Sequence, residues 1–123
     1  MARNRNAGGA GIGELIDVVR ESALGKKGEG LTVLDVSGRT ILADAFAIVS
    51  GRSKIQTRAI ADAIAQAAEK SGRRVARIEG HADGGWILID LGNLIVHVFT
   101  PKQRTFYNLE RLWGEPAART GTP

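Results

Sequence analysis

Two apolar runs on either side of Gly92-Asn93 constrain the fold of this chain more than any other stretch. This dipeptide suits the two-residue turn of a β-hairpin, in which neighbouring strands run antiparallel. With that turn in place, Trp86 lies opposite Phe99, and Leu88 lies opposite His97. Because successive strand residues point to opposite faces of a sheet, this register sorts the hairpin side chains into two sets.

One set is entirely aliphatic and predicts a face that is buried in the core. Its members are Ile87, Ile89, Leu91, Leu94, Val96 and Val98. The other set is mixed, and its members are Trp86, Leu88, Asp90, Ile95, His97 and Phe99. If this second face is open, it is the best candidate for a partner-binding surface. If a helix covers it, His97 and Asp90 only satisfy nearby backbone groups, and for a single histidine in a strand this alternative is favoured.

The whole chain predicts an α/β fold in the order α-β-β-α-β-β-β-α, with a mixed β-sheet and flanking helices. The expected elements are a helix over 12–25, strands over 31–36 and 43–50, a helix over 54–70, a strand over 73–79, the hairpin over 86–99, and one helix or two short turns after residue 100. We expect residues 1–11 to be a disordered basic and glycine-rich terminus, 12–114 to be a single domain, and 115–123 to be a mobile tail.

Sequence signals at the helices give more detailed expectations. Ser53 with Gln56, and Thr100 with Gln103, match the capping box that starts a helix. Pro101 suits the first helical position. From spacing, the helix after residue 53 is expected to bury Ile55, Ala59, Ile60, Ala63, Ile64 and Ala67. In the last helix, Phe106, Leu109 and Trp113 are expected to share a face.

Composition limits the classes of function. The 123 residues include no cysteine, which excludes disulfides and thiolate metal sites. No apolar run reaches the roughly 20 residues of a membrane span, so we expect no membrane association and a cytoplasmic location. The net charge of +4 favours polyanionic surroundings such as RNA or the ribosome. No motif for sequence-specific reading of nucleic acid is present.

Residues that could carry catalysis or bind a metal are sparse. The chain has only two histidines, His81 and His97, so no zinc or iron site is expected. Ser50 or Ser53 forms a triad on paper with His97 and Asp90, but no G-x-S-x-G elbow supports it. The strand-turn-helix after Ser50 also resembles nucleotidyltransferases, which hold magnesium with paired carboxylates. Here Asp62 lies within a predicted helix and Asp90 stands alone, so we expect no enzyme activity, metal or cofactor.

Several motifs in order through the chain are similar to one known family. They are Leu34-Asp35-Val36, Ala43-Asp44 with Phe46, Ser50-Gly51 with Ser53, Glu79-Gly80, Gly85-Trp86, Asp90-Leu91-Gly92, His97-Val98-Phe99 and residues 104–113, RTFYNLERLW. With these motifs, residues 15–114 resemble the bacterial and organellar ribosomal silencing factors, also called iojap-like or RsfS proteins. There are two departures: Ala45 stands where the family often has a bulky residue, and Asn93 replaces a usual aspartate.

The resemblance implies a nucleotidyltransferase-like fold that is not known for catalysis. It also implies binding to the large ribosomal subunit, through the subunit protein numbered fourteen, on the face that the small subunit joins. A protein bound there blocks subunit joining and represses translation when nutrients are limiting. Organellar relatives imply an alternative role in assembly of the large subunit, and a residual nucleotide-transfer enzyme is a third possibility.

Aromatic anchors and arginines dominate many protein interfaces, which selects candidate contact residues on and after the hairpin. These candidates are Trp86, His97, Phe99, Pro101, Arg104 and Tyr107. Trp86 and Phe99 have alternative roles as core residues or as contacts in a homodimer.

Overall fold

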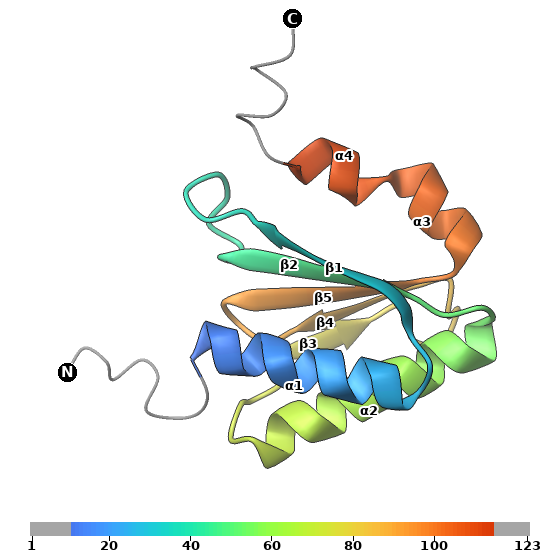
Figure 1. Cartoon of the computed structure of the whole chain (residues 1–123), viewed down its shortest axis with the longest axis horizontal. Coiled ribbons are helices and arrows are strands. Elements are labelled where there is room, and N and C mark those ends of the chain that lie inside the picture. Colours follow the sequence, from blue (N-terminus) through green and yellow to red (C-terminus); the bar gives the residue numbers. More distant parts are fainter. Residues whose placement is uncertain (1–10, 115–123) are drawn as a thin grey trace, which may run out of the picture.

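The computed structural model describes residues 11–114, shown in Figure 1. The expectations for residues 1–10 and 115–123 lie outside the described residues. The elements are α1 (Ile12–Gly25), β1 (Glu29–Asp35), β2 (Ala45–Ser50), α2 (Lys54–Lys70), β3 (Arg77–Glu79), β4 (Trp86–Asp90), β5 (Leu94–Phe99), α3 (Pro101–Tyr107) and α4 (Leu109–Trp113). The predicted α/β class and the order of elements are confirmed, and two short helices follow the hairpin.

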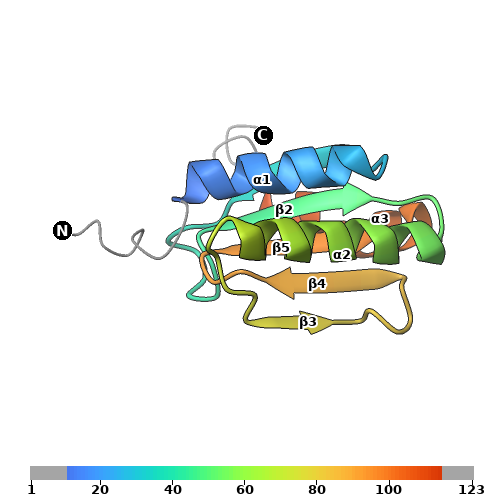
Figure 2. The same cartoon turned by 90° about the horizontal axis from the view of Figure 1, so that it is seen from below.

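The five strands form one mixed sheet in the order β1-β2-β5-β4-β3. Strands β2 and β5 are parallel, and the other neighbouring pairs are antiparallel. Helices α1 and α2 lie side by side on one face of the sheet, as Figure 2 shows. Helices α3 and α4 lie over the opposite face (Figure 1). The sheet is therefore the middle layer of the described structure, and its two faces have different covers.

The central hairpin has the register that the sequence predicts. Trp86 pairs with Phe99, and Leu88 pairs with His97. The turn is closed by a 2.9 Å hydrogen bond from the Leu91 amide to the Leu94 carbonyl. All six side chains of the predicted aliphatic face are buried in the main core, against α1 and α2. Their burial confirms which face of the hairpin points inward.

The start of α2 confirms one expectation and corrects another. The Ser53 hydroxyl accepts a hydrogen bond from the Gln56 amide, as an N-cap does. The Gln56 side chain, however, accepts from the Arg52 amide instead of completing the box at Ser53. The prediction that Ile55 is buried is wrong, because its side chain is 78% exposed. Thr57 occupies the inner position of this turn, and its hydroxyl donates to the Gly84 carbonyl.

The buried stripe of α2 is consequently rotated from the predicted one. It consists of Thr57, Ile60, Ala61, Ile64 and Ala68. The expected members Ala59, Ala63 and Ala67 are only partly buried at the edges of this stripe. A helix so rich in alanine has several nearly equal apolar faces, and the buried Thr57–Gly84 hydrogen bond favours this one.

Asn108 separates α3 from α4. It has left-handed backbone angles, with φ of 47°, and its side chain accepts from the Arg111 amide to cap α4. This break turns Leu109 toward the sheet and leaves Phe106 76% exposed, so the predicted shared face is wrong for Phe106. At the start of α3, Pro101 is at the first position as predicted. Thr100 makes no side-chain cap, so the second capping box is not formed.

Candidate partner-binding surface

Trp86, at the first position of β4, is the centre of an aromatic cluster on the sheet face under α3 and α4. Its ring centroid lies 5.0 Å from that of Phe99, its partner across the hairpin. The Tyr107 ring of α3 lies 4.5 Å from the indole and 6.4 Å from the Phe99 ring. The indole nitrogen donates a 3.0 Å hydrogen bond to Nδ1 of His97. The indole is half-buried and is fixed in place by three neighbours.

His97 is the polar support of this cluster. Its side chain is buried, and burial lowers its pKa from 6.5 to about 4, so the ring is neutral at pH 7. Since an indole N–H can only donate, Nδ1 is the acceptor and the proton of the neutral ring is on Nε2. Within residues 11–114, no hydrogen-bond partner reaches Nε2. The Phe46 ring packs edge-on against the imidazole, at 5.0 Å between centroids.

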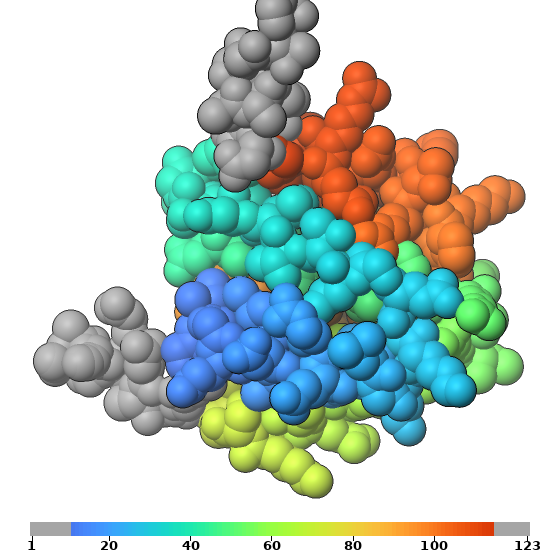
Figure 3. Space-filling model, in the orientation of Figure 1, coloured from blue at the N-terminus to red at the C-terminus, as the bar shows by residue number. Residues whose placement is uncertain are grey.

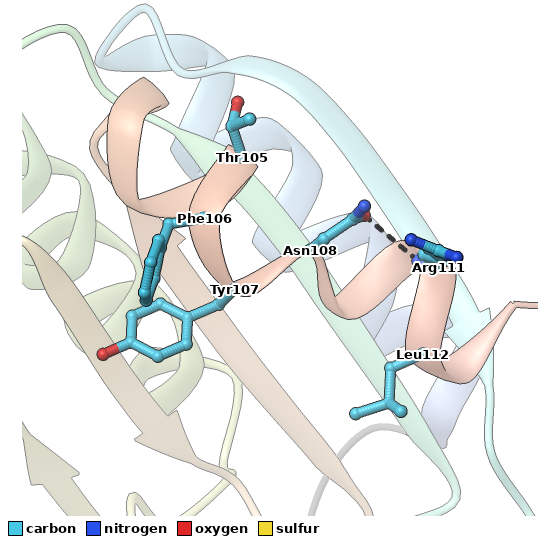
Figure 4. Close-up of a pocket in the computed structure, with 6 residues that line it drawn as sticks. All are labelled: Thr105, Phe106, Tyr107, Asn108, Arg111 and Leu112. Carbon is cyan, nitrogen blue, oxygen red and sulfur yellow. Dashed lines mark hydrogen bonds between the residues drawn. The ribbon is translucent and has the colours of Figure 1, made fainter.

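Exposed apolar side chains surround a hollow on α3 and α4, which Figure 4 shows. The hollow measures about 590 Å³ and is lined by Thr105, Phe106, Tyr107, Asn108, Arg111 and Leu112. Phe106 is 76% exposed, Leu112 63% and Tyr107 45%. A second hollow, of about 270 Å³, lies beside Trp86 and Leu88, next to Glu79 and Gly80 of the β3 side.

Trp86 lines the smaller hollow and Tyr107 lines the larger one, and their rings are in contact at 4.5 Å, so the two hollows adjoin. We call the surface around them the apolar ridge, and it consists of Trp86, Leu88, Phe106, Tyr107 and Leu112. Clustered apolar groups on a protein surface are typical of a site that a partner covers. The ridge is thus the part of the second sheet face that is best suited to an interface.

Arg104 of α3 turns away from the ridge and into the fold. Its guanidinium donates 3.1 and 2.6 Å hydrogen bonds to the Glu110 carboxylate of α4. It also donates to the Gly30 carbonyl of β1, at 2.7 Å, and to the Ser50 hydroxyl of β2, at 2.9 Å. Only 15% of the side chain is exposed. Arg104 therefore fastens both short helices to the edge of the sheet.

A second arginine fastens the far end of α4. Arg39, in the loop between β1 and β2, donates to the carbonyls of Trp113 and Gly114. Its guanidinium also lies 5.6 Å from the centre of the Trp113 ring. Both ends of the α3–α4 segment are consequently tied to the β1–β2 side of the sheet.

The structure brings four of the six predicted contact residues together: Trp86, His97, Phe99 and Tyr107. Phe99 has no exposed surface and His97 almost none, so in this conformation they support Trp86 from beneath. Pro101 is exposed at the start of α3, and Arg104 is directed inward. That these residues contact a partner remains a prediction.

Sequence reasoning did not select Leu88, Phe106 or Leu112 for this surface. Leu88 was placed on the mixed face of the hairpin but was not distinguished from its neighbours there. For Phe106 and Leu112, the available signal was Asn108, a residue type that tolerates left-handed geometry and starts a new helix well. A helix break at that position changes which side chains of this segment point outward.

Ser50, His97 and Asp90, which could form a catalytic triad on paper, interact with other groups in the structure. The Ser50 hydroxyl accepts from Arg104, and His97 accepts from Trp86. Asp90 accepts from the Gly92 amide and lies 3.4 Å from Arg77. Among the residues described, no three potential metal ligands gather in one place. None of the helices within residues 11–114 has the length and apolar character needed to span a membrane.

Comparison with known proteins extends these observations. The sequence model of a family described as "Ribosomal silencing factor during starvation" matches residues 11–122. The ribosomal silencing factor RsfS of Halalkalibacterium halodurans is 39% identical over 102 residues, which are 83% of this chain and 87% of that protein. The protein of the same name from Bacillus subtilis is 42% identical over 90 residues, covering 73% of this chain and 76% of that one.

A solved structure is similar in fold as well as in sequence. The crystal structure of a Chromobacterium violaceum protein matches with a TM-score of 0.82 at 33% identity, over 85% of this chain and 87% of that chain. The family match includes the hairpin, the aromatic cluster and both short helices. With the predicted resemblance thus confirmed, the chain belongs to the ribosomal silencing factor family.

Proposed function

We propose that this protein binds the large ribosomal subunit at the surface that faces the small subunit, and that the apolar ridge makes the contact. The ridge is the observation that carries the proposal. It presents five large apolar side chains, among them the Trp86–Tyr107 ring pair, and clustered aromatic anchors of this kind account for most of the energy of many interfaces.

The proposed partner is the large-subunit protein numbered fourteen, as the family resemblance implies. Binding at that position represses translation by occlusion, because a bound 13.1 kDa protein occupies space that the small subunit needs. The proposed mechanism includes no chemical step, and it fits the names of the relatives, which describe silencing factors rather than enzymes.

Rigid support makes the ridge suitable for such a contact. Trp86 is held by the His97 hydrogen bond and by Phe99, and Tyr107 is held by α3, which Arg104 ties to the sheet. A surface that is ordered before binding loses less conformational entropy when it binds. The ridge therefore needs only modest contact area to be effective.

Site-specific cross-linking tests the proposal. A photoreactive p-benzoylphenylalanine in place of Tyr107 is expected to cross-link to the large-subunit protein numbered fourteen when large subunits are irradiated with the protein. The same group in place of Ile78, which is 39% exposed on β3 and pairs with Ile89 on the sheet face away from the ridge, is the matched control and is expected not to react with that protein.

Three other outcomes have definite meanings. Cross-linking of position 107 to a different subunit protein contradicts the proposed partner but keeps the ridge as the contact. Cross-linking to a second copy of this chain shows that the ridge is a homodimer interface. Cross-linking at position 78 alone places the contact on the sheet face that α1 and α2 cover and rejects the ridge.

A further inference from the structure

We infer that the end of the molecule where α1 stops and α2 and α3 begin is an RNA-binding surface, which contacts phosphate groups of ribosomal RNA beside the protein contact. This inference rests on the proposed function and adds a second point of attachment to it. It is carried by six cationic side chains that the fold gathers at this end, which we call the basic end: Lys26, Lys27, Arg52, Lys54, Arg58 and Lys102.

Hydrogen bonds hold these segments together although they are far apart in sequence. The Gln56 amide group donates to the carbonyls of Lys26 and Lys27, which joins the end of α1 to the first turn of α2. The Gly51 amide donates to the Phe99 carbonyl, and the Thr100 amide donates to the Gly85 carbonyl. In Figure 1 the end of α1 and the starts of α2 and α3 lie on the same side of the molecule.

The positive charge of the described chain is concentrated at this end. Two carboxylates, Glu29 and Asp83, lie among the six cations, and they pair with Arg52 and Lys54 at 3.0 and 3.5 Å. Over the rest of residues 11–114, ten carboxylates outnumber eight arginines and lysines. Within residues 11–114, the excess of positive charge therefore lies at the basic end.

Three lysines of the basic end are available for a partner. Lys26, Lys27 and Lys102 are exposed, and no carboxylate of residues 11–114 lies within 4.0 Å of their ammonium groups. An ammonium on a flexible stem is a point charge that suits phosphate contacts without selecting a base sequence. This chemistry favours an RNA backbone over a protein surface, on which acidic groups are sparser and less regular.

The basic end is also continuous with the apolar ridge. Helix α3 contributes Lys102 from its first turn to the basic end, and Phe106 and Tyr107 from its last turn to the ridge. In the space-filling view of Figure 3, α3 meets the green start of α2 on one side of the molecule. A surface made of RNA and protein side by side, as on a ribosomal subunit, therefore fits both regions in one orientation.

Salt dependence of binding to purified large subunits tests the inference. The test variant is Lys26→Gln/Lys27→Gln/Lys102→Gln, and its control is Arg20→Gln/Lys70→Gln/Arg74→Gln, which removes three exposed cations elsewhere. Each lost phosphate contact lowers the slope of log Kd against log salt by roughly 0.7–0.9. We expect the test variant to lose a slope of about 2 and bind at least tenfold more weakly at low salt, and we expect the control to keep the wild-type slope.

A second arm separates failure of the inference from failure of the proposed function. All three proteins are titrated against a fluorescent RNA hairpin in low salt. Equal slopes on subunits for wild type and test variant overturn the inference while the proposed function stands. If the wild type does not bind subunits, the proposed function fails. Selective loss of hairpin binding by the test variant then still supports an RNA surface, and equal hairpin binding by test and control variants overturns it.

Discussion

At the scale of single residues, His97 shows how the fold uses a neutral imidazole. The ring accepts from the Trp86 indole and is surrounded by Phe46, Trp86 and Phe99. A charged imidazolium would lose this hydrogen bond, because Nδ1 would carry a proton, and it would have to be desolvated. His97 therefore fixes the orientation of Trp86 only while it is neutral.

The pH dependence of stability follows from this. Burial lowers the pKa of His97 from 6.5 to about 4, so the unfolded chain takes up a proton first as the pH falls. The contribution of His97 to folding is fully present above pH 6.5 and is lost between pH 6.5 and 4. The loss is about 3 kcal/mol at most, from the 1.36 kcal/mol that each pKa unit represents.

Urea unfolding of wild type and His97→Gln at pH 7.5, 6.0 and 5.0 measures this effect. The wild type is expected to lose stability over this range, and His97→Gln is expected to lose clearly less. His81→Gln, the same change at the second histidine, whose side chain is 40% exposed, is the control for removing an imidazole outside the core. Parallel curves for wild type and His97→Gln would show that His97 is not the group responsible.

Tyr107 gives the cleanest test of the ridge by substitution. Tyr107 is 45% exposed, and its side chain makes no hydrogen bond within residues 11–114, whereas Trp86→Ala would also remove the partner of His97. We expect Tyr107→Ala to weaken binding to the large subunit by about 2 kcal/mol, which is over tenfold in Kd. The free energy of unfolding should change by less than about 1 kcal/mol.

Co-sedimentation with large subunits and a melting curve, measured on the same preparation, separate these effects. Ile78→Ala removes a partly exposed apolar side chain from β3, away from the ridge and the basic end, and is the matched control, with binding expected to be unchanged. Tyr107→Ala protein that melts normally and sediments normally would remove Tyr107 from the contact surface.

Residues in the hairpin were predictable because two strong local rules agree there. The turn dipeptide sets the register, and the alternation of side chains then assigns Ile89 and Val96 to the core without further information. Arg104 was not predictable in the same way. Its partners Gly30 and Ser50 are distant in sequence, and only the assembled sheet brings them to α3.

At the scale of elements, the α3–α4 segment depends on its arginine ties more than on its own helical stability. The two helices have 7 and 5 residues, which is too short to be stable in isolation. Leu109 and Trp113 pack against the sheet, and Arg104 and Arg39 hold the two ends. The position of Tyr107 on the ridge is thus set indirectly by Arg104.

Arg104→Met tests this dependence, since it keeps the aliphatic stem and removes the guanidinium. The variant leaves the Glu110 carboxylate without its 2.6 Å partner, and we expect a loss of about 2–3 kcal/mol in the free energy of unfolding. Amide hydrogen exchange should rise within α3 and α4 more than in β4 and β5.

Arg20→Met is the control for this variant. Its ion pair with Asp17 is largely exposed, and such pairs contribute less than about 1 kcal/mol. Exchange that rises equally across the whole sheet in Arg104→Met would contradict a specific role for Arg104 in holding α3 and α4.

The elements follow the sequence prediction closely, except that the strand expected over 73–79 forms only over Arg77–Glu79. The inner faces of the elements follow the prediction less well. The spacing of apolar residues, and the glycines and prolines that end an element, determine where a helix or strand occurs. Which side of α2 faces the sheet depends on a buried hydrogen bond from Thr57 to Gly84, between segments that no local pattern connects. The unburied Ile55 follows from this interaction, whereas the outward Phe106 follows from the helix break at Asn108.

At the scale of the whole molecule, one face of the sheet forms the main core and the other carries the proposed contact surface. Helices α1 and α2 close one face of the sheet and complete the main core. The other face is covered only by short helices, and the edge of that cover forms the ridge (Figure 1). The basic end lies where three helix termini meet, beside the ridge. A large partner can therefore contact both surfaces without disturbing the core.

Reassociation of separated ribosomal subunits measures directly whether the bound protein occludes subunit joining. Large and small subunits are mixed under joining conditions, without nucleotide, with increasing amounts of this protein, and are resolved on a sucrose gradient. We expect the amount of whole ribosomes to decrease and the protein to migrate with free large subunits. We expect the same effect to require over tenfold more of the Tyr107→Ala protein. Equal formation of whole ribosomes with and without saturating protein would show that the protein does not occlude subunit joining.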